Sequence, residues 1–412
     1  MTTLVVRGIG ELSTCDARRG AAPGVITNAA LVARDGVITF VGPEAGLAEH
    51  VSHAQSDGEI EEIDAAGAAV IPSFVDSHTH LVWLGDRSDE YAMRAAGATY
   101  EEIATSGGGI RATVHATGAG TVEELIRATR ARARRALRHG TTTIEVKSGY
   151  GLDIDAEMRQ LDAARQLGDV DDVPDIVTMY LALHATPDSD RQSYIDDVCG
   201  RGVKEAAGRA TFVDAFCEQT AFSVDECARL FEAAAQHGLR AKVHAEQRSR
   251  IGGAALAARV GAVSADHLEY ASDGDLEALA AADVVGVILP GASLVLGGPP
   301  PPGRRILEAG GTLAVATDCN PGTCYSESMP LMVSLAVALG GVALAQALVA
   351  ATSGGAAALG LADRGVLRAG MRCDAIILNS PHWLDVGYHL GGDVVGQVIR
   401  EGRIVINLAG EE

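Results

Sequence analysis

Two histidines that stand two residues apart offer the clearest chemistry in the sequence. His78 and His80 follow Phe74 and Val75, which have the apolar character of a short buried strand. Side chains at positions i and i+2 of a strand point to the same side, so both imidazoles can reach one metal ion. The pair alone is weak support, because a chain with 12 histidines can produce it by chance.

Polar residues with ligating or catalytic chemistry also follow other apolar runs. They are Glu145, Lys147, Tyr150, His184, His244, Glu246, Gln247, Asp266, His267, Asp318, Asn320 and Gly322. A single histidine near a strand end is more often a hydrogen-bonded core residue than a ligand. A whole set of polar residues at the ends of neighbouring strands is hard to explain by packing, since burial of unpaired polar groups costs free energy. The pattern therefore favours one polar site built by the ends of several strands.

The simplest arrangement is one divalent or trivalent ion with four protein ligands. We expect these ligands to be His78, His80, His244 and Asp318. Mixed imidazole and carboxylate ligands suit zinc or iron, so the expected cofactor is one Zn2+ or Fe3+ per subunit. A catalytic site keeps a position open for water, whose pKa the metal brings down to about 7. His267 could orient or deprotonate that water, and Asp318 could take its proton.

Further donors near these strand ends suggest the shape of the substrate. Arg87, Tyr150 and His184 suit a carboxylate, which an arginine binds in a fork. Additional amide and hydroxyl contacts are expected at Asn320, Gly322 and Thr323. The alternative for Arg87 is a salt bridge on a loop, and the residues alone leave both interpretations open. The glycine run at 107–109 is a flexible lid or a phosphate cradle. No Lys-Ser/Thr follows it, which argues against a P-loop.

Eight apolar, strand-like runs must position these groups. The runs are Phe74–His80, Thr141–Lys147, Ile176–His184, Thr211–Glu218, Leu239–Glu246, Val263–His267, Val284–Pro290 and Leu313–Asp318. Helical patterns follow most of them, and Ser223 with Glu226 predicts a capping box before one helix. The alternation predicts an α/β fold, a (β/α)8 barrel with its site at the carboxyl ends of the strands. A doubly wound open sheet is the competing fold.

The two chain ends predict a second, smaller unit. Residues 1–70 read as short strands with Gly and Asp turns, and Asp374–Asn379 and Val394–Ile406 read the same way. We therefore expect a small β-sandwich from residues 1–70 plus 365–412. The barrel would then occupy residues 71–364.

The composition describes an acidic globular protein. Hydrophobic residues make up 47% of the 412 residues, and the formal net charge of −21 argues against nucleic acid as a partner. The seven cysteines include no C-x-x-C pair and no secretory signal is apparent, so we expect a cytoplasmic protein. The stretch 329–351 carries no charge, but Pro330 and Gly340 interrupt it. That pattern favours two short buried helices over a membrane span.

The motifs resemble those of the metal-dependent amidohydrolase superfamily and, within it, the imidazolonepropionase family. The general motifs are VDSHTH and the ligating residues of VHAE, ADHL and ATD. The specific motifs are HLVWLGDR, AGATYEEI, SGGGI, TTTIEVKSGYGLD, HAEQ, SADHLEYAS and ATDCNPGT. The resemblance implies hydrolysis of the ring amide of 4-imidazolone-5-propanoate to N-formimino-L-glutamate in histidine degradation.

The resemblance also implies roles for individual residues. It implies metal ligation at His78, His80, His244 and Asp318, and catalysis by His267, Asp318 and Gln247. It implies contacts to a small-molecule substrate at Arg87, Tyr150, His184, Gln247, Asn320, Gly322 and Thr323, with Tyr100 as a further contact. Lys147 is not implied as a metal-bridging carbamate, because this branch resembles mononuclear enzymes. A homodimer is implied by the family alone.

Two other functions stay open. A deaminase or related amidohydrolase acting on another nitrogen heterocycle would use the same general metal motif. Arg87 and the VKSGYGL stretch favour a substrate with a carboxylate instead. An inactive barrel that serves as a scaffold would be expected to lose metal ligands, and here every proposed ligand is present.

Overall fold

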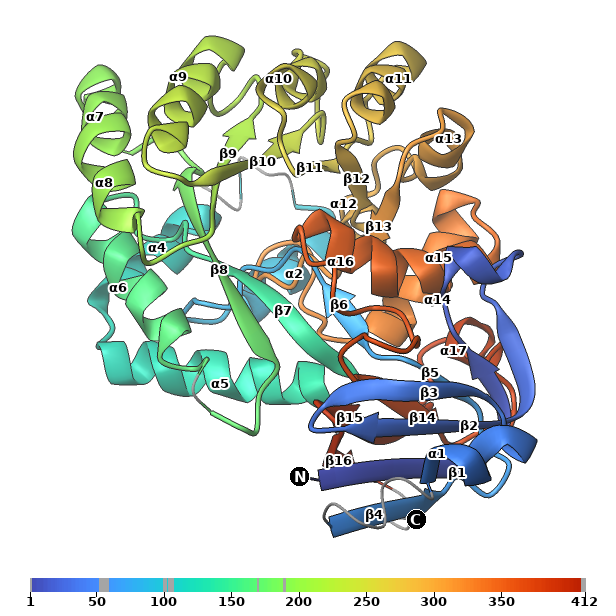
Figure 1. Cartoon of the computed structure of the whole chain (residues 1–412). Coiled ribbons are helices and arrows are strands. Elements are labelled where there is room, and N and C mark those ends of the chain that lie inside the picture. Colours follow the sequence, from blue (N-terminus) through green and yellow to red (C-terminus); the bar gives the residue numbers. More distant parts are fainter. Residues whose placement is uncertain are drawn as a thin grey trace.

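Eight parallel strands in sequence order form one sheet of the protein (Figure 1). The computed structural model describes residues 2–51, 59–98, 102, 107–168, 170–187 and 190–408. The strands are β6 (Phe74–Asp76), β7 (Thr141–Lys147), β8 (Asp175–Leu183), β9 (Phe212–Cys217), β10 (Arg240–Ala245), β11 (Ser264–His267), β12 (Val285–Ile288) and β13 (Leu313–Val315). Each overlaps one of the runs predicted from the sequence.

Contacts between the first and last strands bring the sheet round into a barrel. The Asp318 N–H donates to the His78 carbonyl at 3.0 Å, and the His80 N–H donates to the Cys319 carbonyl at 3.0 Å. The buried Asp76 side chain accepts from Thr317 N–H at 3.1 Å and from Thr317 Oγ1 at 2.6 Å. The predicted (β/α)8 barrel is confirmed, and the alternative of an open sheet is wrong.

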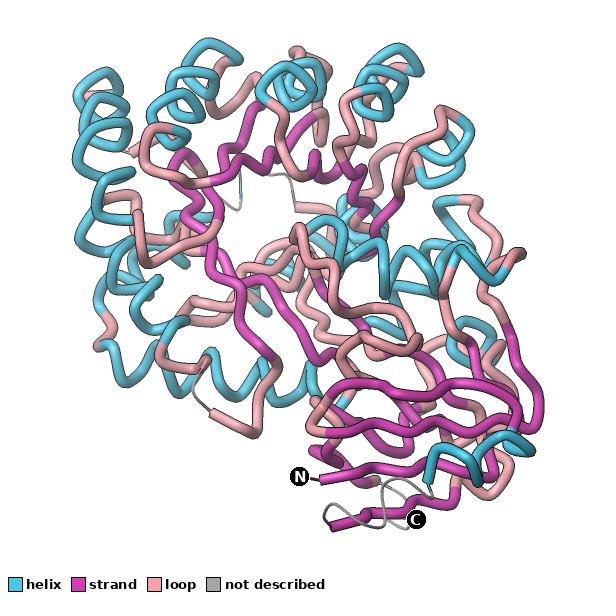
Figure 2. Tube along the Cα trace, in the orientation of Figure 1, coloured by secondary structure: helices cyan, strands magenta, loops and turns pink. Residues whose placement is uncertain are grey.

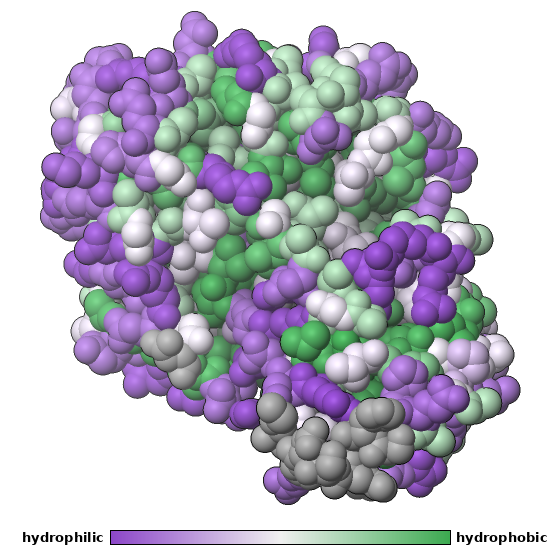
Figure 3. Space-filling view, viewed as in Figure 1, coloured by the Kyte–Doolittle hydropathy of each residue, from purple (hydrophilic) through white to green (hydrophobic). Residues whose placement is uncertain are grey.

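Helices follow the barrel strands along the chain, and most of them lie outside the ring of strands (Figure 2). They are α2 (Ser88–Ala95), α4 (Ile110–Ala119), α5 (Val122–Arg138), α6 (Ile154–Arg165), α7 (Arg191–Asp197), α8 (Val203–Ala206), α9 (Val224–Ala235), α10 (Gly253–Val260), α11 (Asp273–Ala281), α12 (Pro290–Leu296), α13 (Gly303–Glu308), α14 (Met329–Gly340), α15 (Leu344–Val349) and α16 (Gly355–Ala358). Hydrophilic residues cover the helices α7 to α9, at the upper left of Figure 3, as expected for helices that face solvent.

Two helix predictions are confirmed. Before α9, Ser223 Oγ accepts from the Glu226 N–H at 3.4 Å and Glu226 Oε2 accepts from the Ser223 N–H at 2.7 Å, which is a capping box. The uncharged stretch 329–351 contains the short helices α14 and α15. Within the described part of the chain, no helix is long and apolar enough to cross a membrane.

Both chain ends contribute to a second, mixed sheet at the lower right of Figure 1. Its strands are β1 (Thr2–Ser13), β2 (Val25–Arg34), β3 (Val37–Pro43), β4 (Glu59–Asp64), β5 (Val70–Pro72), β14 (Ala375–Leu378), β15 (Val395–Arg400) and β16 (Arg403–Asn407), with the short helices α1 (Leu47–Val51) and α17 (Asp385–Tyr388) nearby in sequence. Leu4 and Leu31 share one core cluster with Ala375 and Ile399. The prediction that the two ends build one small β unit is therefore confirmed.

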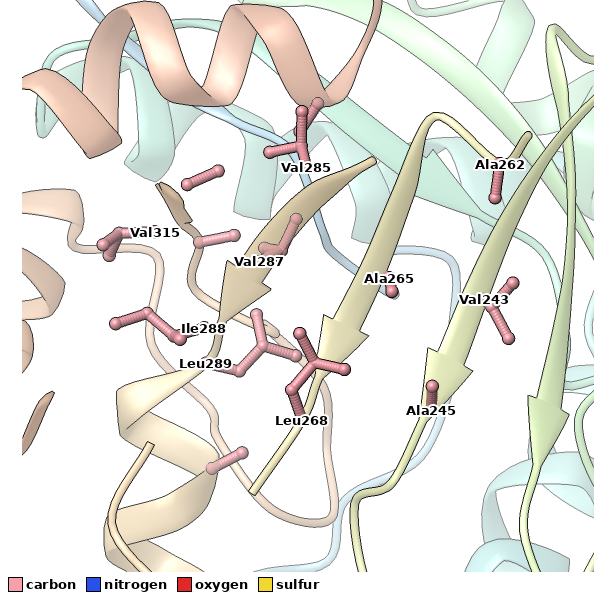
Figure 4. Packing of buried hydrophobic residues seen from close by; sticks show 14 of the residues in the cluster. Val243, Ala245, Ala262, Ala265, Leu268, Val285, Val287, Ile288, Leu289 and Val315 are labelled. Atoms are coloured by element: carbon pink, nitrogen blue, oxygen red, sulfur yellow. The ribbon is translucent and has the colours of Figure 1, made fainter. Parts of the chain in front are cut away.

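Apolar and polar side chains alternate along β7 and β10, and this alternation turns polar groups toward the site. In β10, Val243 and Ala245 belong to the hydrophobic core cluster (Figure 4). The intervening residues Lys242 and His244 lie on the other face of the strand, toward the barrel interior. There Lys242 Nζ reaches Glu145 Oε2 of β7 at 3.0 Å.

Candidate active site

Three imidazoles meet inside the barrel at the ends of β6 and β10. His78, His80 and His244 are buried, and their potential ligand atoms lie within 4.8 Å of one another. Asp318 follows β13, and its Oδ1 lies 3.5 Å from His78 Nε2 and 3.4 Å from His80 Nε2. The structure thus brings together all four predicted metal ligands.

The donor set fits a metal ion. His78 Nε2 and His244 Nε2 are buried ring nitrogens without a hydrogen-bond partner among the described residues, and His80 turns its Nε2 toward Asp318. Burial lowers the pKa of His80 to about 3 and that of His244 to about 4, so both rings are neutral and keep a lone pair for coordination. Three neutral imidazoles beside one carboxylate are ligands that suit zinc or iron.

Carboxylates behind the cluster orient two of its imidazoles. Asp266 Oδ2 lies 2.6 Å from His78 Nδ1, and Asp214 Oδ2 lies 2.9 Å from His244 Nδ1. Such partners fix the tautomer of a ligating histidine and turn the opposite nitrogen toward the metal. Sequence reasoning placed Asp266 at a strand end without this role, and it missed Asp214. The alternation of side chains along a strand could have identified Asp214. It stands two residues before Phe216, which lines the cavity, so both side chains lie on the same inward face of β9.

Two buried lysines balance these carboxylates. Lys147 Nζ lies 2.8 Å from Glu145 Oε2 and 3.0 Å from Asp214 Oδ2. Burial lowers the pKa of Lys147, but the Glu145 and Asp214 carboxylates outweigh it and raise that pKa above its ordinary value. Lys242 Nζ donates to the Ser77 carbonyl at 2.6 Å and to Glu145 at 3.0 Å. Lys147 thus belongs to a buried ion-pair network with Glu145 and Asp214.

His267 is the last residue of β11 and lies beside the histidine cluster. Its ring centroid is 5.3 Å from that of His244. Its Nδ1 is 3.7 Å from Glu269 Oε2. Burial lowers the pKa of His267, but the carboxylates of Glu269 and Asp318 raise it above the ordinary value. His267 is therefore the imidazole of the site most inclined to carry a proton.

A cavity of about 430 Å³ opens above the cluster. The predicted site residues that line it are His80, Arg87, Tyr150, His184, His244, Gln247, His267, Asp318, Asn320, Gly322 and Thr323. His78 lies beneath it, within the cluster. Phe216, Ile110 and Leu296 add apolar surface. Tyr100 lies outside the described residues.

The loop that carries Tyr150 is held by α6. Glu157 accepts from the N–H groups of Gly149 and Gly151, both at 2.6 Å. The Gly149 carbonyl lies 2.8 Å from His184 Nδ1. A Cβ on Gly149 would stand 2.9 Å from that nitrogen, so the close approach requires glycine. Sequence reasoning missed Glu157, because only the folded loop brings its carboxylate under these N–H groups.

Asn320 already uses its polar atoms within its own turn. Its Nδ2 donates to the Asp318 carbonyl and to Thr323 Oγ1, both at 2.7 Å. Its Oδ1 accepts from the N–H groups of Gly322 and Thr323, both at 2.8 Å. Asn320 therefore shapes the loop after β13 and holds Asp318 and Thr323 in place at the cavity.

The fold and the site define the class: the chain is an amidohydrolase, a barrel hydrolase with a buried histidine cluster. A model of the Amidohydrolase family matches residues 196–406. A zinc-bound adenosine deaminase from Xanthomonas campestris has the same fold, with a TM-score of 0.73, 19% identity, and coverage of 98% of this chain and 93% of that chain. The A. niger ochratoxinase has a TM-score of 0.69 at 19% identity, over 99% of this chain and 96% of its own.

Curated relatives identify the particular family. The imidazolonepropionase of Deinococcus radiodurans is 44% identical over 409 residues, which cover 98% of this chain and 99% of the relative. That of Geobacillus kaustophilus is 40% identical over 390 residues, covering 93% and 91%. The chain belongs to the imidazolonepropionase family of hydrolases.

Proposed function

We propose that the chain hydrolyses 4-imidazolone-5-propanoate to N-formimino-L-glutamate. One observation carries the proposal: Arg87, Tyr150 and His184 line the same cavity as the histidine cluster. A guanidinium, a phenol and an imidazole suit the propanoate tail, and the cluster suits the ring amide. The names of the relatives agree with this substrate.

His78, His80, His244 and Asp318 would hold one Zn2+ or Fe3+ per chain. A bound ion of this kind polarises a carbonyl and lowers the pKa of nearby water. The zinc in the adenosine deaminase of the same fold is consistent with this cofactor.

The protein's own residues carry the remaining steps. Arg87, Tyr150 and His184 bind the tail, and Gln247 hydrogen-bonds the ring, so the ring amide lies over the cluster. His267 donates to the carbonyl oxygen as the water oxygen bonds to the carbonyl carbon. Asp318 takes the proton of that water and passes it to the ring nitrogen as the C–N bond breaks. The products of this bond cleavage are a carboxylate and a formimino group, with one water added.

We propose a homodimer, on the family resemblance alone, and a cytoplasmic location, which agrees with seven free cysteines. We also propose domain boundaries at 1–70 plus 365–412 and 71–364. The chain passes between the two sheets at Ser73, from β5 to β6.

A substrate panel tests the proposal. Purified protein is assayed with 4-imidazolone-5-propanoate, adenosine and cytosine, and loss of substrate and release of ammonia are followed in parallel. We expect consumption of the imidazolone alone, without ammonia. Ammonia from adenosine or cytosine together with an unchanged imidazolone would overturn the proposal in favour of a deaminase.

A further inference from the structure

Arg87 enters the cavity with one edge of its guanidinium already bound. Its Nε donates to Glu90 Oε1 at 3.0 Å, and its Nη2 donates to Glu90 Oε2 at 2.7 Å. Both side chains are largely buried, with 13% of Arg87 and 10% of Glu90 exposed. This side-on pair uses two of the five N–H groups. It leaves the end of the fork, formed by Nη1 and the second N–H of Nη2, for another acceptor.

Gly322 lies against the same guanidinium from the loop after β13. A Cβ on Gly322 would stand 2.5 Å from Arg87 Nη1 and 3.1 Å from Cζ. No other residue type leaves that space, because every other residue adds a Cβ. The Glu90 carboxylate thus binds one edge of the guanidinium, and the backbone of Gly322, which has no side chain, lies close to Nη1.

Glu90 also joins Arg87 to the glycine-rich segment. Glu90 Oε1 accepts from the Gly109 N–H at 2.8 Å. Ile110, the next residue, begins α4 and lines the cavity. One carboxylate therefore fixes both the arginine and the start of the helix that forms the adjacent wall.

We propose that Glu90 and Gly322 are positioning residues that preset Arg87 for a carboxylate tail. An arginine side chain that is ordered beforehand loses less rotamer freedom when substrate binds, which favours binding of an anion that matches its fork. The inference rests on the proposed function and goes further, because it assigns tail selectivity to Glu90, which does not line the cavity, and gives Gly322 a role in placing Arg87 besides any contact to the substrate.

The test compares two substrates that differ only in the tail. The kcat and KM are measured for 4-imidazolone-5-propanoate and for its neutral tail amide with the wild type, Glu90→Gln and Gly322→Ala. We expect both variants to raise KM for the carboxylate about tenfold and to lower the preference for carboxylate over amide by the same factor. Asp89→Asn removes an exposed carboxylate in the same turn of α2 and should keep the wild-type preference.

Each outcome of this comparison either supports or contradicts the positioning role of Glu90 and Gly322. An unchanged preference in the variants, or an equal loss on both substrates, would overturn the positioning role. If Glu90→Gln fails to fold, Gly322→Ala carries the test, since it keeps the Glu90 pair. If the wild type turns over neither substrate, the proposed function falls and this inference falls with it. An active wild type with unaltered variants contradicts the inference alone.

Discussion

At the scale of single residues, the imidazoles of the cluster depend on the carboxylates behind them. Asp266 accepts from Ser264 Oγ at 2.5 Å, and its other oxygen lies 2.6 Å from His78 Nδ1. The carboxylate is therefore fixed before it fixes the histidine. An imidazole without this partner would be free to turn or to change its tautomer, which weakens coordination through the opposite nitrogen.

Replacement of Asp266 should therefore weaken metal binding. We expect Asp266→Asn to lower the affinity for Zn2+ by about 10 to 100-fold, with the fold intact. Competition with a chromophoric chelator measures the affinity, and circular dichroism checks the fold. Asp283→Asn removes an exposed carboxylate and serves as the control. Equal Zn2+ affinities in the wild type and in Asp266→Asn would show that the carboxylate that contacts His78 does not support metal binding.

Removal of the Arg87 side chain should separate substrate binding from metal binding. Arg87→Ala deletes the fork and should reduce kcat/KM about a hundredfold, mainly through KM. Metal stoichiometry, measured by elemental analysis, should stay at the wild-type value because Arg87 does not belong to the histidine cluster. Full activity of this variant would exclude Arg87 from binding the tail.

At the scale of elements, the start of α9 shows how one acidic residue anchors a helix. Glu226 accepts from Arg191 Nε at 2.8 Å and from Arg191 Nη2 at 2.7 Å. It also closes the capping box with Ser223. The hydrogen bonds from Arg191, assisted by those from Ser223, outweigh burial and lower the pKa of Glu226 to about 2.

This lowered pKa predicts a pH-dependent contribution to stability. The folded pKa lies below the ordinary value of 4.5, so the stabilisation is fully present above that pH and is lost as the pH falls through about 2. We expect Glu226→Gln to lower the midpoint of urea unfolding at pH 7, and the difference from wild type to shrink at pH 3. Glu232→Gln, on the exposed face of α9, is the matched control. A difference that stays constant between the two pH values would contradict the assignment.

The sequence predicts elements better than it predicts partners. The barrel strands were recognisable because apolar runs alternate with helical patterns, and the capping box of α9 has a local spacing. Lys242 and Glu145 lie 97 residues apart and meet only across the barrel interior. No pattern of neighbouring residues in the sequence predicts such a long-range ion pair. Glu90 stands three residues after Arg87, and this spacing would have allowed the ion pair to be predicted, but the sequence analysis left the partner of Arg87 unnamed.

At the scale of the whole molecule, the proposed metal site would link metal binding to folding. The proposed ligands come from both ends of the barrel sequence, since His78 follows β6 and Asp318 follows β13. An ion that binds only the folded chain stabilises it by about 2.7 kcal/mol at a free concentration of 100 times its Kd. Metal binding should therefore stabilise the closure of the barrel.

Removal of the metal should accordingly lower the Tm. We expect treatment with a chelator to reduce the Tm in calorimetry, and added Zn2+ to restore it. His244→Ala lacks one ligand and should show a much smaller response to both treatments. Identical Tm values for the wild type before and after metal removal would contradict a link between the histidine cluster and a bound ion.

Product analysis tests the central claim most directly. 4-Imidazolone-5-propanoate is generated in situ, the metal-replete protein is added, and the products are followed by mass spectrometry. The proposed function predicts a species one water heavier that matches N-formimino-L-glutamate, and its loss in Asp318→Asn or after treatment with a chelator. No such species from metal-replete wild-type protein would contradict the claim.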